Sequence, residues 1–219
     1  MAVAAIFDLD GTLVTFKLDI REWRKVIIDV MSKRGFDTSG LDLVTPTQEI
    51  LDRAKAQVPS DATERYDSLR REAFTILDSL EIEGARSASL FPGVGEVLRR
   101  LKSTGFRLGL LTNSGRAAAS LSLTRWDLQG LFELILTRDD IDAMKPRPEG
   151  LSKAARMLGV LPYQAYYVGD SVYDVMAAKA AGMKSIAVAT GNYTAERLKS
   201  ERADYVITAL TELPKVLGV

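Results

Sequence analysis

The sequence predicts an α/β protein in which a parallel sheet carries helices on both faces and an all-helical segment is inserted after the first strand. Two observations predict this architecture. Short β-branched or aliphatic runs alternate with segments of helical periodicity over most of the 219 residues. The stretch from about residue 16 to residue 87 breaks the alternation, because it contains helical patterns and no convincing strand. We therefore expect a core domain of residues 1–15 and 88–219 and a helical domain of residues 16–87.

The expected strands are short apolar runs of the length that strands have in globular proteins. They are residues 3–7, 107–111, 134–137, 165–168, 185–189 and 205–207. Amphipathic helices are expected at residues 93–103, 149–158 and 172–181, and a further helix is expected to begin at Arg116. This alternation favours a parallel sheet that is covered on both faces.

The inserted segment shows several apolar patterns of helical spacing. They are Ile20-Trp23-Val26-Ile27-Val30, Ile50-Leu51-Ala54 and Tyr66-Leu69-Ala73-Ile76-Leu80. Thr45-Pro46-Thr47-Gln48 is typical of a capping box with proline at the first helical position, so the second helix is expected to begin here.

The composition excludes several classes of function. Lys and Arg (29) balance Asp and Glu (29), so no overall basic field would hold nucleic acid or an anionic membrane. The absence of cysteine excludes disulfides, thiolate metal sites and a Cys nucleophile, and the absence of histidine removes Ser-His-Asp chemistry, His bases and most zinc sites. No stretch has the length of a membrane span and no signal peptide is recognisable, so a cytoplasmic protein is expected.

Asp8 and Asp10 directly follow the first predicted strand, in Phe7-Asp8-Leu9-Asp10-Gly11-Thr12-Leu13. In an open α/β sheet the ligand site lies beyond the carboxyl ends of the strands, which is where these carboxylates are expected. The alternative is a polar turn made by Asp10-Gly11.

Further polar groups follow other predicted strands. Thr112-Asn113-Ser114-Gly115 precedes a predicted helix and is typical of an anion site, although Asn113 and Ser114 are also good N-cap residues, and taken alone the cap is favoured. Lys145 lies in a loop that two prolines make rigid, and Asp170 and Asp174 are four residues apart around the start of a helix. Closely packed carboxylates repel each other, and all-oxygen ligands without His or Cys indicate Mg²⁺.

These motifs together resemble those of the haloacid dehalogenase superfamily of phosphatases. Asp8-Leu9-Asp10-Gly11-Thr12 is similar to the first motif, Thr112 with Asn113 to the second, Lys145 to the third, and Gly169-Asp170-Ser171-Val172-Tyr173-Asp174 to the fourth. Phe91-Pro92-Gly93-Val94 is typical of the subgroup that includes phosphoglycolate phosphatases and β-phosphoglucomutases. The resemblance covers the entire chain and implies a Rossmann-like core with the helical segment as a cap. Thr15-Phe16 departs from the acidic residue and hydroxyl residue that many members have there, which affects the entry hinge of the cap.

The resemblance implies a role for each motif residue. Asp8 is the expected nucleophile that becomes an aspartyl phosphate, and Asp10 the expected general acid and base. Mg²⁺ is expected on the Asp8 carboxylate, the Asp10 backbone carbonyl and Asp170, with Asp174 acting through water or Lys145. The phosphoryl oxygens are expected to contact Thr112, Lys145 and backbone N–H groups near Gly11 and Asn113.

The function expected from the resemblance is Mg²⁺-dependent hydrolysis of a small phosphate monoester, with phosphoglycolate as the leading substrate. A sugar phosphomutase with the same catalytic residues stays open as an alternative, and a receiver-like phosphorylation switch is a more remote one. Asp10 favours phosphorus over carbon–halogen chemistry, and the complete set of chemical groups argues against an inactive binding protein. Lys17, Arg21 and Arg24 of the cap are expected on a solvated helix face, with contact to a second anionic group of the substrate as the alternative. No oligomeric state is indicated.

Overall fold

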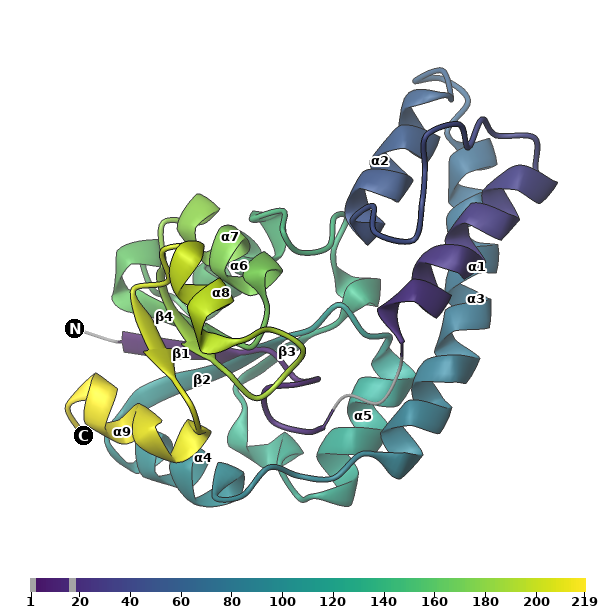
Figure 1. The fold of residues 1–219 in the computed structure, drawn as a ribbon. Coiled ribbons are helices and arrows are strands. Elements are labelled where there is room, and N and C mark those ends of the chain that lie inside the picture. Colours follow the sequence, from purple (N-terminus) through teal and green to yellow (C-terminus); the bar gives the residue numbers. More distant parts are fainter. Residues whose placement is uncertain (1–2, 16–18) are drawn as a thin grey trace.

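The computed structural model describes residues 3–15 and 19–219 of the chain (Figure 1). Within these residues a six-stranded parallel sheet has the order β3-β2-β1-β4-β5-β6. The strands are β1 (Val3–Phe7), β2 (Phe106–Leu111), β3 (Leu134–Leu136), β4 (Ala165–Gly169), β5 (Lys184–Val188) and β6 (Tyr205–Ile207). The predicted α/β fold class is confirmed, and the strands differ from the predicted runs by a single residue at some ends.

β1 lies at the centre of the sheet and pairs with β2 on one side and β4 on the other. Phe7 is aligned with Leu110 of β2 and with Val168 of β4. The chain segments that follow these three strands therefore leave the same edge of the sheet next to one another. This register places the Asp8, Thr112 and Asp170 positions together although they are far apart in the sequence.

Helices cover both faces of the sheet (Figure 1). Alternating β1 residues point to opposite faces, so Ile6 and Phe7 belong to different hydrophobic clusters. The Phe7 face carries α4 (Val94–Ser103), α5 (Arg116–Arg125) and α9 (Leu213–Leu217). The opposite face carries α6 (Glu149–Met157), α7 (Val172–Ala180) and α8 (Ala195–Ser200). Short 3-10 turns lie at Gln129–Leu131, Arg138–Asp140, Pro162–Gln164 and Leu210–Glu212.

The inserted segment forms the cap, which consists of α1 (Ile20–Lys33), α2 (Thr47–Ala56) and α3 (Glu64–Ser87). Figure 1 shows the cap beside the carboxyl ends of the strands, with the far end of α3 reaching α5 of the core. Buried residues such as Ile27, Ile50 and Leu69 join the three helices. The exact division of the chain after residue 15 and after residue 87 stays a prediction.

Two details of the cap correct the sequence analysis. The predicted capping box at Thr45 is wrong, because α2 begins at Thr47 without a side-chain cap and the Thr45 hydroxyl donates instead to Asp42 Oδ1 at 2.8 Å. The predicted apolar face of α3 is wrong at Ile76, which is exposed, whereas the neighbouring Leu77 is fully buried. Leu80 is half-buried and packs against the core cluster, in agreement with the prediction. The buried row of α3 continues instead at a spacing of four residues through Leu69, Ala73, Leu77, Glu81 and Ala85.

None of the helices in the described part of the chain combines the length and the apolar character of a membrane span.

Candidate active site

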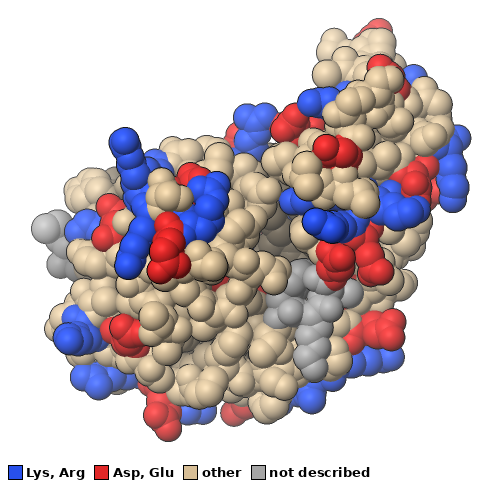
Figure 2. All heavy atoms as spheres, viewed as in Figure 1, with Lys and Arg blue, Asp and Glu red and all other residues tan. Residues whose placement is uncertain are grey.

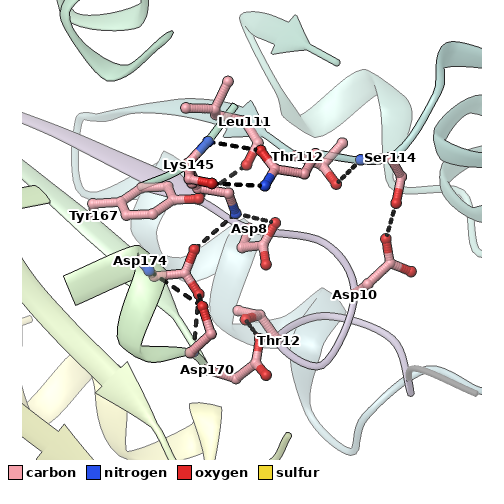
Figure 3. A network of polar contacts seen from close by, with 12 residues as sticks. Asp8, Asp10, Thr12, Leu111, Thr112, Ser114, Lys145, Tyr167, Asp170 and Asp174 are labelled. Atoms are coloured by element: carbon pink, nitrogen blue, oxygen red, sulfur yellow. Dashed lines mark hydrogen bonds and ion pairs between the residues drawn. The ribbon is translucent and has the colours of Figure 1, made fainter. Parts of the chain in front are cut away.

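Lys145 joins two carboxylates at the carboxyl edge of the sheet (Figure 3). Its Nζ lies 2.8 Å from Asp8 Oδ1 and 2.7 Å from Asp174 Oδ1. All three side chains are buried, and the Lys145 ammonium also lies over the ring of Tyr167, 5.4 Å from its centre. Two of the three ammonium N–H groups are occupied by these ion pairs, which leaves one for a ligand.

Asp170 lies beside this pair and is held by Thr12, whose hydroxyl donates to Asp170 Oδ1 at 3.1 Å. The backbone of Gly11 passes close to the Asp170 carboxylate with a φ of +82°. A Cβ at Gly11 or at Gly191 would clash with the Asp170 carboxylate, so these glycines keep the space around it open. Thr190 helps to fix the turn, because its hydroxyl donates to the Gly11 carbonyl at 2.6 Å.

Asp10 turns away from Lys145 and toward the loop after β2 (Figure 3). The Ser114 hydroxyl donates to Asp10 Oδ2 at 2.6 Å. This hydrogen bond holds the Asp10 carboxyl group in one orientation at the edge of the cavity. The two carboxylates of the first motif therefore face different partners, Asp8 toward Lys145 and Asp10 toward Ser114.

The loop after β2 lines the cavity, and its side chains do not cap α5. Thr112 Oγ1 accepts from the Ser114 backbone N–H at 3.1 Å, which leaves the hydroxyl proton of Thr112 to donate elsewhere. The Asn113 side chain and the Lys145 backbone exchange hydrogen bonds of 3.0 and 3.3 Å. The N-cap of α5 is Gly115, without a side-chain bond, so the N-cap interpretation of Asn113 and Ser114 is wrong.

In the fourth motif, one Asp174 oxygen takes part in the cap of α7 and the other contacts Lys145. Ser171 caps α7, and Asp174 Oδ2 completes a capping box by accepting from the Ser171 backbone N–H at 2.9 Å and from its hydroxyl at 2.6 Å. The other Asp174 oxygen accepts from Lys145. Because both Asp174 oxygens have protein donors, Asp174 contacts the rest of the site through Lys145 in this structure. Asp8 and Asp170 each keep one oxygen without a hydrogen-bond partner among the described residues.

Burial and mutual repulsion disfavour negative charge on these carboxylates. Burial raises the pKa of Asp8 to about 7, with Asp174 adding to the rise and Lys145 opposing it. Burial and the nearby Asp174 and Asp8 also raise the pKa of Asp170 well above its ordinary value. Burial would lower the pKa of Lys145, but Asp174 and Asp8 raise it, so the ammonium stays charged. A further cation close to Asp8 and Asp170 would therefore stabilise their ionised forms.

The donor set fits a hard divalent cation. Asp8, Asp170 and Asp174 each offer a carboxylate oxygen, and these oxygens lie within 4.8 Å of one another. Carboxylate and carbonyl oxygens without nitrogen or sulfur donors are the ligands that Mg²⁺ prefers. The open space that Gly11 and Gly191 leave around Asp170 is consistent with such an ion.

A cavity of about 170 Å³ lies between the cap and the core and contains these groups. The core contributes Asp8, Asp10 and Lys145 to its walls, and the cap contributes Ile20, Trp23, Arg24, Pro46 and Thr47. Figure 2 shows the molecule hollowed between these two parts, with basic and acidic side chains interspersed over the visible face. The cavity is smaller than the roughly 300–1,000 Å³ typical of drug-sized ligands, which favours a small metabolite.

Several residues in and beside this cavity have contacts or burial that were not predicted from the sequence. Ser114, which lines the cavity, directly follows the second motif, and Thr12, which is buried beneath it, ends the first. Nothing in the local sequence showed that Ser114 binds Asp10 or that Thr12 binds Asp170. The expected solvated helix face is confirmed for Arg21, which is exposed, and wrong for Arg24, which is 6% exposed. Lys17 lies outside the described residues. Arg24 lies four residues after Ile20 and three before Ile27, and this helical spacing is the sequence signal that places it on the apolar face of α1.

The chain is similar to known hydrolases over nearly its whole length. The sequence model of haloacid dehalogenase-like hydrolases matches residues 5–188. A phosphoglycolate phosphatase from Nitrosococcus oceani is 31% identical, over 97% of this chain and 95% of the relative. A pyrophosphatase from Bacillus pumilus is 29% identical, over 97% of this chain and 95% of the relative. A haloacid dehalogenase family hydrolase from Deinococcus radiodurans, solved with bound phosphate and sodium, is 25% identical and has a TM-score of 0.63, with 99% of this chain and 95% of that chain covered.

These similarities confirm the predicted family and the predicted class of enzyme, a phosphatase. They do not favour the receiver-like switch, because the hydrolase family match begins in β1 and continues across the cap into β5. The chain belongs to the haloacid dehalogenase-like hydrolase family.

Proposed function

We propose that this phosphatase hydrolyses a small, phosphoglycolate-like phosphate monoester with the help of Mg²⁺ and through a phosphorylated Asp8. The observation that carries the proposal is the buried Asp8 carboxylate, which Lys145 holds within a cavity beside Asp170. The phosphate that is bound in the Deinococcus radiodurans structure supports a phosphate site in this family. The names of the phosphoglycolate phosphatase and pyrophosphatase relatives support a small phosphorylated substrate.

In the first step, an Asp8 carboxylate oxygen attacks phosphorus while the bond from phosphorus to the ester oxygen breaks. The ion pair with Lys145 orients Asp8, whose other oxygen has no hydrogen-bond partner among the described residues. The Asp10 carboxyl group gives its proton to the departing oxygen. Burial raises the pKa of Asp10, which favours the protonated form that this step needs.

In the second step, water attacks the phosphorus of the aspartyl phosphate and gives a proton to the Asp10 carboxylate. The bond between phosphorus and the Asp8 oxygen breaks, which releases inorganic phosphate and restores Asp8. The Ser114 hydroxyl holds Asp10 through both steps. One carboxyl group therefore serves first as acid and then as base.

The phosphoryl oxygens are held by donors that the protein does not use internally. The Thr112 hydroxyl proton and the third N–H of Lys145 both remain available, and both residues line the cavity. Backbone N–H groups near Gly11 and Asn113 are proposed to complete the site. Hydrogen-bond donors that are already in position stabilise the charge of the phosphoryl group in the transition state without a rearrangement of the protein.

Mg²⁺ is proposed to be held by the Asp8 carboxylate, the Asp10 backbone carbonyl and Asp170, with Asp174 acting through water or Lys145. When bound, the ion supplies the positive charge that allows a carboxylate and a phosphate group to approach each other. The cytoplasmic location and the absence of a nucleic-acid partner stay predictions.

Replacing Ser114 with alanine is expected to lower kcat/KM for phosphoglycolate by about 10-fold, because Asp10 loses the donor that orients it. The effect on 4-nitrophenyl phosphate should be smaller, since nitrophenolate departs without a proton. Steady-state assays with both substrates measure the difference, and Ser114→Thr, which keeps a hydroxyl, should recover most of the activity. Equal losses with the two substrates would contradict this role of Ser114.

The proposal is tested with a panel of phosphate monoesters assayed for phosphate release in Mg²⁺ and in excess EDTA. We expect turnover of phosphoglycolate, a fall of roughly 10³-fold in EDTA, and recovery when Mg²⁺ is added back. Equal rates for the metal-stripped and Mg²⁺-loaded enzyme would contradict the metal dependence. Conversion of a sugar 1-phosphate into its 6-phosphate would favour the mutase alternative, and phosphorylation of the protein without turnover would favour the switch.

A further inference from the structure

Arg24 is a buried cation in the wall of the active-site cavity. Its side chain extends from α1, is 6% exposed and lines the same cavity as Asp8. Nη1 donates to the Leu43 carbonyl at 2.8 Å, and Nη2 donates to the Tyr173 hydroxyl at 3.3 Å. Nε is buried and has no hydrogen-bond partner in the part of the chain that the structure describes. Two neutral groups therefore hold the guanidinium while part of its donor capacity stays unused.

Arg24 lacks the counter-charge that the other buried cations have. Lys145 is paired with Asp8 and Asp174, and Arg138 is paired with Asp78 and Glu81. Among residues 3–15 and 19–219, no carboxylate forms an ion pair with Arg24. A buried charge without a partner is costly to folding, and an anion that entered the cavity would supply the missing counter-charge.

Asp42 is an acidic group close enough to interact with Arg24, but it serves another purpose. It is exposed, and its Oδ1 accepts from the backbone N–H groups of Val44 and Thr45 at 3.0 and 2.8 Å. The hydrogen bonds from Thr45 are the main reason that the pKa of Asp42 is lowered, and the charge of Arg24 contributes least. Asp42 therefore stabilises its own turn and does not neutralise Arg24.

Arg24 lies where the cap meets the core at the wall of the cavity. The guanidinium bridges the cap and the core, because Tyr173 lies at the start of α7, one residue before Asp174. The Tyr173 ring is packed edge-on against Tyr193, with 6.5 Å between the ring centres, and both line the cavity together with Trp23. The phosphoryl group is proposed to bind at Lys145 of the core, and Arg24 belongs to the cap side of the same cavity.

We propose that Arg24 binds a second anionic group, a carboxylate or a phosphate, on the leaving group of the substrate. The substrate class is then a small phosphate monoester or anhydride whose leaving group is itself negatively charged. This inference rests on the proposed phosphatase function of the same site. A guanidinium with unused donors at a desolvated wall pairs well with either anion and discriminates strongly against a neutral group of the same size.

The test compares two substrates that differ by one charge, 2-phosphoglycolate and ethyl phosphate, with the parent and three variants. The parent should prefer phosphoglycolate in kcat/KM by roughly 100-fold. Arg24→Met should remove most of this preference, and Arg24→Lys, which keeps the charge and loses the planar fork, should keep part of it. Arg21→Met is the matched control, because it removes an exposed positive charge from the same helix and should leave the preference intact. The kcat/KM value for pyrophosphate, assayed as a third substrate, shows whether the favoured anion is a carboxylate or a phosphate.

A binding measurement separates this inference from turnover. Phosphonoacetate should raise the melting temperature of the parent more than ethylphosphonate does, and Arg24→Met should respond equally to both. Arg24→Met is expected to fold, because it removes a charge that has no protein counter-charge. If the parent hydrolyses neither ester, the proposed function fails and the melting data decide this inference. Equal kcat/KM values for the two esters in the parent, equal losses for both in Arg24→Met, or equal melting shifts in the parent would overturn it.

Discussion

Replacing Asp8 with asparagine is expected to lower kcat/KM for phosphoglycolate by roughly 10⁴-fold or more, because the covalent route through Asp8 is removed. Asparagine keeps the shape of the side chain, but its amide does not attack phosphorus. It also withdraws one of the two carboxylates that lie within 2.8 Å of Lys145 Nζ. Steady-state phosphate release measures the loss, and saturating Mg²⁺ ensures that weaker metal binding is not its cause.

A direct observation of the intermediate accompanies this experiment. Acid quenching during turnover, followed by peptide mass spectrometry, should find phosphate on the peptide that contains Asp8 in the parent and none in Asp8→Asn. Asp61→Asn, which makes the same chemical change at an exposed position of the cap, should turn over like the parent. An Asp8→Asn variant that hydrolyses the substrate at the parent's rate would falsify the proposed mechanism.

Replacing Arg138 with methionine is expected to lower the free energy of unfolding by about 3 to 5 kcal/mol, because Glu81 is left buried without its counter-charge. Arg138 follows β3, is fully buried and reaches into the cap. Its Nη2 lies 2.5 Å from Asp78 Oδ1, its Nη1 pairs with Glu81, and its guanidinium lies over Phe74 at 4.3 Å from the ring centre. The melting temperature should fall on the order of 10 °C for a chain of this size.

The destabilisation should depend on pH in a defined direction. Burial raises the pKa of Glu81 from 4.5 to about 7 while Arg138 lowers it, so removing Arg138 raises this pKa further. A carboxyl group whose pKa is higher in the folded state binds protons on folding, and its ionisation destabilises the protein as the pH rises through that window. The difference between the parent and Arg138→Met should therefore be larger at about pH 8 than at about pH 5.

Two further variants show whether the loss of stability comes from the buried pair of Arg138 and Glu81 or from the loss of any positive charge. Arg138→Met combined with Glu81→Leu should recover part of the lost stability, because no uncompensated charge is then buried; the Gly115 N–H still loses its acceptor. Arg53→Met, which breaks the exposed pair with Glu49, should change stability by less than about 1 kcal/mol. Denaturant unfolding supplies the free energies. An Arg138→Met variant as stable as the parent would show that the cap does not depend on this contact.

The strands and the motif residues could be predicted from the sequence because both are local signals. An apolar run such as Val3–Phe7 predicts a strand, and a carboxylate directly after it lies at the strand end wherever the chain goes next. The resemblance then supplied roles for Asp8 and Asp10 that spacing alone left open between a turn and a catalytic pair. The predicted α3 face failed at Ile76 because the buried row runs from Ala73 through Leu77 to Glu81, and a buried glutamate does not show as apolar in the sequence.

The sequence by itself determined the order of strands and helices, the position of the cap and the groups available for chemistry, because these depend on residue type and short-range spacing. Only the tertiary structure decided which groups meet. Ser114 reaches Asp10 across 104 positions of the chain, and Arg24 is buried although its neighbour Arg21 is exposed. Such contacts depend on how the cap and the core pack against each other, and that packing sums many weak interactions over the whole molecule that no short segment contains.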